Sequence, residues 1–217
     1  MAAADPPASR AAGPPAGPTH QIAAGTRQLA THTHPLAGPT RPRATTHRSP
    51  CRDARLNPTS GDVVRIDAAV LCLLNRVRGS HHLRPLRLNN DLQGVAAGQT
   101  HDMVSGDYFG DNSLSGQTPM QRILATPYPA GAVHLAAAQN IGWATGPDAT
   151  PTGIVDAWMS SPPHRAIILT ASYRDVGVGV TPAAPSSLAH GLSGATYTLE
   201  FGLRVFSAKP ARARRRH

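Results

Sequence analysis

The chain has 217 residues, enough for one domain with tails, and its formal net charge of +9 is unevenly distributed. From Gly61 to Ala208 there are 9 Arg against 10 acidic residues, so the positive charge lies outside the part that can fold. This excludes a basic domain that reads nucleic-acid sequence. No run approaches the roughly 20 apolar residues of a membrane-spanning helix, so no transmembrane segment is predicted.

Composition also divides the chain into parts. Residues 1–60 contain 10 of the 21 prolines and none of the 9 aromatic residues, so they cannot bury a core. We therefore predict a disordered Pro/Ala/Arg-rich segment at 1–50, a folded domain at 51–208 and a basic tail at 209–217. The tail has five positive charges, which suit either a solvated end or contact with an anionic surface.

The first two predicted elements are helices. Over 62–78 apolar residues recur at spacings of three and four, and Gly79 follows as a stop signal. A second helix is expected to begin at Asn90 or Asp91, which suit an N-cap, and to end before Gly106.

Two further helices are marked by capping residues. Thr118 followed by Pro119 is a cap with a first-turn proline, and it predicts a short helix through Leu124. Thr150 or Thr152 is expected to start the next helix.

Strands follow the helices along the chain. Residues 176–180 and 197–201 alternate in the manner of half-buried strands. Helices early and strands late predict an α+β domain with helices packed on an antiparallel sheet. Trp143 and Trp158 lie in apolar stretches and are expected to anchor the core.

Seven phrases, in this order, resemble the CAP superfamily, also called SCP or PR-1-like domains, in its bacterial form. They are LCLLNRVRG (71–79), LRPLRLNNDL (83–92), DYFGDNSLSGQTPMQRI (107–123), QNIGWATG (139–146), DAWMSSPPHRAIIL (156–169), YRDVGVGV (173–180) and TYTLEFG (196–202). The resemblance implies an α-β-α sandwich that is usually secreted. It also implies a cleft that in many members holds a divalent metal with two His and two acidic residues.

The resemblance places four residues of this chain in that cleft. Asp111 stands where the family has its first His, Gln139 where an ENI phrase supplies an acid, and Ser161 where the second acid belongs. His164 matches the last His directly.

These substitutions weaken the predicted metal site. Asp111 and His164 are the only strong donors left in the cleft, because Gln139 supplies a neutral amide and Ser161 a hydroxyl. Zinc normally takes three or four His, Cys or carboxylate ligands. We therefore expect no cofactor, and a zinc site retained through Asp111 and His164 is the alternative.

A hydrolase is the alternative from another class. Ser160 or Ser161 would be the nucleophile, His164 the base and Asp111 its acidic partner. The simpler interpretation of Ser-Pro-Pro-His is a helix start, with Ser161 as N-cap and Pro162 in the first turn. No GxSxG elbow accompanies the motif.

The two cysteines, Cys51 and Cys72, would be incidental free thiols if taken alone. The family resemblance favours a disulfide between them, since bacterial relatives often carry Cys at both places. A stable disulfide implies an oxidising compartment, which predicts a secreted or envelope-associated protein. The first residues lack the charged start and apolar stretch of a secretory signal, and this conflicts with that prediction.

The sequence therefore predicts an extracellular CAP-like binding module rather than an enzyme. Its cleft would recognise a small or extended ligand without turnover. The hydrolase and a structural domain with a vestigial cleft remain the two alternatives.

Overall fold

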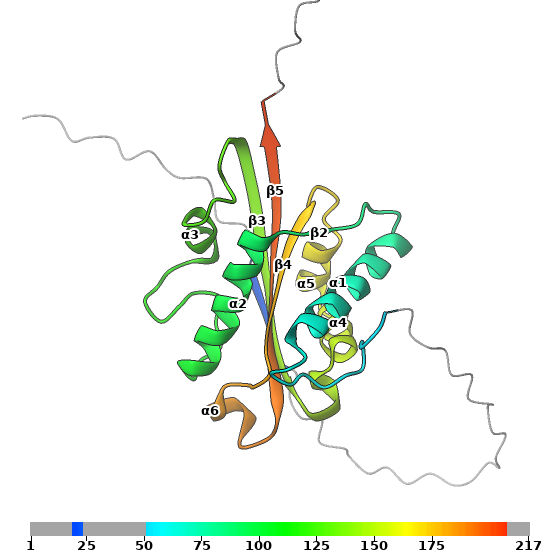
Figure 1. Ribbon diagram of the computed structural model, residues 1–217, viewed down its shortest axis with the longest axis vertical. Coiled ribbons are helices and arrows are strands. Elements are labelled where there is room, and N and C mark those ends of the chain that lie inside the picture. The colour runs from blue at the N-terminus through cyan, green and yellow to red at the C-terminus, as the bar shows by residue number, and fades with distance from the viewer. Residues whose placement is uncertain (1–18, 24–50, 208–217) are drawn as a thin grey trace, which may run out of the picture.

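The computed structural model describes residues 19–23, by their backbone, and residues 51–207. A mixed five-stranded sheet lies between two groups of helices (Figure 1). The elements in chain order are β1 (Thr19–Ala23), α1 (Val63–Ser80), β2 (Arg87–Leu88), α2 (Asn90–Ser105), α3 (Pro119–Leu124), β3 (Ala132–Thr145), a 3₁₀ turn η1 (Gly146–Ala149), α4 (Pro151–Ser160), α5 (Pro162–Ile168), β4 (Asp175–Thr181), α6 (Ser186–Ala189) and β5 (Gly194–Phe206).

The sheet has the order β1-β3-β5-β4-β2. The central strand β5 pairs antiparallel with both β3 and β4, whereas the short edge strands β1 and β2 run parallel to their neighbours. The predicted α+β sandwich with a central antiparallel sheet is confirmed, and the two predicted strands lie within β4 and β5. Strand β3 was not predicted, because its Ala- and Gly-rich sequence lacks the alternation of β-branched residues on which strand prediction rests.

The predicted helix starts agree with the structure to within a residue. Thr118 forms a capping box with Gln121 at the start of α3, and Thr150 caps α4 through the amide of Gly153. Helix α2 is capped by Asn89 and not by the predicted Asn90 or Asp91, because the Asn89 side chain accepts the hydrogen bonds of two following amides.

Helices cover both faces of the sheet. A Cβ atom placed on Gly177 of β4 would lie 2.1 Å from the backbone of Leu92, so α2 rests directly on this strand. On the opposite face, a Cβ on Gly142 of β3 would lie 2.7 Å from the side chain of Ile154 in α4. Figure 1 shows α2 and α3 on one side of the sheet and α1, α4 and α5 on the other.

The main core lies between the sheet and the layer of α1, α4 and α5. Trp158 is fully buried there, and its ring meets Tyr197 edge-on at a centroid distance of 6.4 Å. Trp143 is 8% exposed, so the expectation that both tryptophans are core residues is confirmed. No helix among the described residues is long and apolar enough to cross a membrane.

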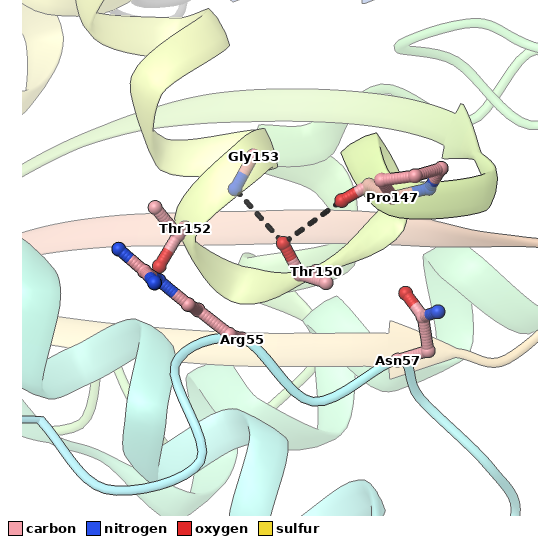
Figure 2. Close-up of a pocket in the computed structure, with 6 residues that line it drawn as sticks. All are labelled: Arg55, Asn57, Pro147, Thr150, Thr152 and Gly153. Carbon is pink, nitrogen blue, oxygen red and sulfur yellow. Dashed lines mark hydrogen bonds between the residues drawn. The ribbon is translucent and has the colours of Figure 1, made fainter. Parts of the chain in front are cut away.

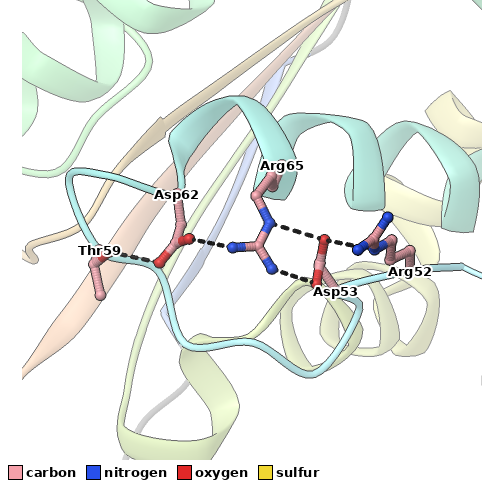
Figure 3. A network of polar contacts seen from close by, with 5 residues as sticks. All are labelled: Arg52, Asp53, Thr59, Asp62 and Arg65. Carbon is pink, nitrogen blue, oxygen red and sulfur yellow. Dashed lines mark hydrogen bonds and ion pairs between the residues drawn. The ribbon is translucent and has the colours of Figure 1, made fainter.

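The segment before the domain is tied to α1 by a disulfide between Cys51 and Cys72, as the family resemblance implied. Beside it Asp53 accepts two hydrogen bonds from the guanidinium of Arg65, which also pairs with Asp62 (Figure 3). The hydrogen bond from Arg65 lowers the pKa of Asp53. The disulfide and the ion pairs therefore hold the same short segment, which begins at Cys51, against α1.

The predicted disordered segment 1–50 differs from the structure at residues 19–23, which form β1. The other residues of this segment and the basic tail 209–217 lie outside the described part of the chain. The possible contact of the tail with an anionic surface stays a prediction.

Candidate functional site

Ser161 and His164 form the first pair at the predicted site. The Ser161 hydroxyl lies 2.7 Å from Nδ1 of His164, whose side chain is buried at the start of α5. Helix α5 does begin at Pro162, as the helix-start interpretation predicted, but the Ser161 side chain makes no capping hydrogen bond. The hydroxyl thus bonds the imidazole instead of the helix backbone.

Ser160 does not take part in this pair. Its hydroxyl donates to the carbonyl of Asp156 one turn back in α4, 2.8 Å away, and the residue is exposed. Of the two predicted serine candidates, the structure therefore places Ser161 alone beside His164.

Gln139 and Glu200 form the second pair. They lie directly opposite each other on β3 and β5, and the Gln139 amide donates to the Glu200 carboxyl group over 2.6 Å. Both side chains are fully buried. The family pattern expects an acid at Gln139. A carboxyl group does lie beside this position, but it comes from Glu200 on the neighbouring strand β5.

Asp111 lies in the loop between α2 and α3, and two buried or half-buried side chains hold that loop. Arg122 of α3 donates to the Asp111 carbonyl oxygen over 2.9 Å, and Gln99 of α2 donates to the carbonyl of Gly110 over 2.8 Å. Asp111 and Arg122 both act electrostatically on Glu200. The loop, α3 and the Gln139–Glu200 pair thus form one polar cluster.

Strand β3 connects the two groups of residues. Gln139 and Asn140 are consecutive in the strand, so their side chains point to opposite faces of the sheet. Gln139 bonds Glu200 on one face, and the Asn140 amide donates to the carbonyl oxygen of His164, 3.2 Å away, on the other. We use the name β3 site for two groups that this strand connects: Asp111, Gln139 and Glu200 on one side of the sheet, and Ser161 and His164 on the other.

The carboxyl group of Glu200 has an unusual protonation equilibrium. Burial disfavours its charged form and raises its pKa to about 8, although the hydrogen bond from Gln139 and the charge of Arg122 act in the opposite direction. The negative charge of Asp111 adds to the increase. Near neutral pH the carboxyl group is therefore mostly neutral.

These donors do not fit a zinc site. Gln139 offers a neutral amide, Ser161 offers a neutral hydroxyl, and burial keeps the Glu200 carboxyl group mostly protonated. Within the described part of the chain, no three His, Cys, Asp or Glu side chains gather closely enough to hold a metal ion. Zinc needs three or four such ligands around one point.

Sequence reasoning missed Glu200 and Arg122. Glu200 is the only glutamate of the chain, but it falls on the polar side of the strand's alternation with Thr196 and Thr198, which predicts an exposed residue rather than the buried one observed. Nothing in the sequence near Arg122 indicates that it reaches the Asp111 loop eleven residues away.

Cavities outlined by described residues also occur away from the β3 site. One of about 380 Å³ lies between the segment after Cys51 and the start of α4, lined in part by Arg55 and Asn57 (Figure 2). Its threonines already have structural partners, because Thr150 caps α4 and Thr152 donates to the carbonyl of Ala54. This cavity therefore marks where the preceding segment packs on the domain.

Residues 71–192, more than half of the chain, match the model of the Cysteine-rich secretory protein family, CAP. A Bacillus subtilis (strain 168) protein described as uncharacterized protein YkwD is 27% identical over 140 residues, which cover 62% of this chain and 51% of the relative. The chain thus spans about half the length of this curated relative.

Solved structures give similar matches. An extracellular protein containing a SCP domain from Bacillus anthracis is 24% identical, with a TM-score of 0.49 over 66% of this chain and 41% of that chain. An outer surface protein from Borrelia burgdorferi is 20% identical, with a TM-score of 0.47 over 62% of this chain and 90% of that chain. A cysteine-rich secretory protein from Staphylococcus aureus is 19% identical, with a TM-score of 0.49 over 67% and 40%.

Proposed function

Because the chain belongs to the cysteine-rich secretory protein family, CAP, we propose that it is an extracellular or envelope-associated binding module. Its β3 site would hold a small or extended ligand through hydrogen bonds, without turnover. The observation that carries this proposal is the Gln139–Glu200 pair, in which a neutral amide and a mostly neutral carboxyl group replace metal-ligand chemistry.

Two observations support the extracellular placement. The Cys51–Cys72 disulfide suits an oxidising compartment. Two similar solved structures are described as an extracellular protein and an outer surface protein.

The test is a binding screen against arrayed peptides and glycans, followed by affinity measurements on the strongest hits. Asp111→Ala should weaken binding at least tenfold, because it removes a half-buried polar group of the β3 site. Asp156→Ala is the matched control, since Asp156 is exposed on α4 and should have no effect. Unchanged affinity in Asp111→Ala and His164→Ala would instead favour a structural domain with a vestigial cleft.

We also propose that no stoichiometric zinc binds near neutral pH, because Gln139 offers a neutral amide, Ser161 a hydroxyl and Glu200 a mostly protonated carboxyl group. Calorimetric titration of the full chain with zinc should show no tight site. One tight zinc that disappears in His164→Ala would contradict this, and His101→Ala, on the exposed face of α2, is the control.

A hydrolase is the second candidate function, and the Ser161–His164 contact of 2.7 Å is the observation that favours it. Assays of turnover with ester, peptide and glycan substrates distinguish a hydrolase from a binding module. Our proposal predicts no turnover, whereas turnover abolished by both Ser161→Ala and His164→Ala would establish the enzyme.

A further inference from the structure

The outer edge of β3 is covered by a segment of the chain's own N-terminal region. Strand β1 pairs in parallel with β3 in a continuous register from Thr19 opposite Gln139 to Ala23 opposite Trp143. Residues 24–50 separate this strand from Cys51, where the domain begins. The connection from β1 to its partner β3 comprises residues 24–131, far more than the dozen or so residues that parallel pairing needs.

The covered stretch includes Gln139, the residue of β3 that belongs to the β3 site. Gln139 and Asn140, which bond Glu200 and His164, are the first two residues that β1 faces. Helix α5, which carries His164, also contacts β1. The segment therefore lies along the site, between the sheet edge and α5.

The edge of β3 has the properties of a strand-addition site. β3 is 14 residues long, and β1 covers only five of them on the side away from β5. An uncovered strand edge presents a row of backbone N–H and C=O groups that pair with any extended chain of suitable shape. Main-chain hydrogen bonds supply affinity in such sites, and flanking side chains supply specificity.

The N-terminal sequence suits this role at one place. Residues 19–34 are the longest proline-free run within the first 50 residues. Proline has no backbone N–H and is poorly tolerated in a paired strand, so this run can supply an unbroken row of donors. β1 occupies its first five positions.

We propose that the β3 edge at Gln139–Trp143 is a peptide-binding site that acts by strand addition, with Thr19–Ala23 as its intramolecular occupant. The inference rests on the proposed function and names its ligand class, an extended polypeptide segment. An external peptide must displace β1 before it binds. Because β1 belongs to the same chain as β3, it competes as an intramolecular ligand and selects against weak peptides.

The test uses the full chain and the double variant Gln21→Pro/Ile22→Pro. Proline has no backbone N–H, and alternate residues of a strand donate to opposite sides. Two adjacent prolines therefore remove a hydrogen bond to β3 whichever of the two residues donates it. Backbone hydrogen exchange should become at least tenfold faster in this variant at those amides of residues 139–143 that point away from β5. Gln28→Pro/Leu29→Pro is the matched control, since the same change falls outside β1 and should leave that exchange unchanged.

A synthetic peptide of residues 17–25 is then titrated into both proteins. It should restore protection of residues 139–143 in the Gln21→Pro/Ile22→Pro variant and bind wild-type protein at least tenfold more weakly. Unchanged exchange in the variant, or equal peptide affinity for both proteins, would overturn the inference.

These outcomes are separable from the proposed function. If the array screen finds Asp111-dependent ligands while exchange at 139–143 is unaffected by the prolines, only the strand-addition inference fails. The opposite result is also possible. If the prolines speed exchange at residues 139–143 and the peptide restores their protection, the strand-addition inference holds. If the screen then finds no Asp111-dependent ligand, the proposed role of Asp111 fails.

Discussion

Glu200 shows how a single residue can change the chemistry of this site. It is the only glutamate of the chain, and it is fully buried opposite Gln139. Asp67, buried in α1 with Gln93 as its hydrogen-bond donor, has a pKa that burial raises to about 7. Both acids keep their protons more tightly in the folded chain than in the unfolded chain.

The raised pKa values of Glu200 and Asp67 make the free energy of unfolding fall as pH rises. An acid with a raised folded pKa favours the native state at low pH, and that contribution is lost as pH rises from its unfolded pKa through its folded pKa. For Glu200 the window extends from about 4.5 to about 8. Wild-type stability should therefore fall across this range.

Glu200→Gln should remove most of that loss, because the neutral amide has the same shape and can still accept from Gln139. We expect the variant to be more stable than wild type by about 2 to 4 kcal/mol at pH 9 and by less than about 1 kcal/mol at pH 4. Urea unfolding at both pH values measures this. A constant difference between the two proteins at both pH values would show that Glu200 is not protonated in the native state.

Among the contacts between elements, helix α2 packs very closely on β4. The two glycines of β4, Gly177 and Gly179, face the helix, where a Cβ would come within 2.1 Å and 2.3 Å of the backbone of Leu92 and Ala96. Because α2 also carries Gln99, which holds the loop before Asp111, the position of the site depends on this contact.

Gly177→Ala should therefore destabilise the domain by about 3 kcal/mol, because backbone atoms cannot move aside as a flexible side chain can. Gly98→Ala is the matched control on α2, where an added Cβ meets nothing within 4 Å. The control should gain about 0.5 to 1 kcal/mol from better helix propensity. Thermal unfolding of both variants checks the pair, and equal effects of the two changes would contradict the packing described here.

At the scale of the whole molecule, the Cys51–Cys72 disulfide joins the start of the domain to α1 across a sequence separation of 21. It closes a loop that includes Asp53 and Asp62, both paired with Arg65. The exposed ion pairs add little to stability, whereas the cross-link restricts the unfolded chain.

Cys51→Ser/Cys72→Ser should lower the free energy of unfolding by about 3 kcal/mol in the chain-entropy model. Reduction of wild-type protein should give a similar loss, and the same reductant should leave the double variant unchanged. Mass analysis without reductant of protein from its native source should show two hydrogens fewer than the reduced form. Two free thiols in that protein would instead favour a reducing compartment.

Helix starts and the family phrases could be predicted from the amino-acid sequence, because they depend on residues that are close together in the chain. The cap and proline at Thr118–Pro119 and the cap at Thr150 predicted helix starts, because capping involves side chains and amides within one turn. The ordered phrases predicted the family and hence the sandwich, and they placed Ser161 and His164 within reach of each other.

The contacts between segments that are distant in the sequence could not be predicted, because they depend on how the whole chain folds. Gln139 meets Glu200 through the register of β3 and β5, Arg122 reaches the Asp111 loop through the packing of α3, and β1 lies on an edge that its own sequence does not specify. Strand register and edge pairing depend on which chain segments are brought side by side, so no local pattern encodes them.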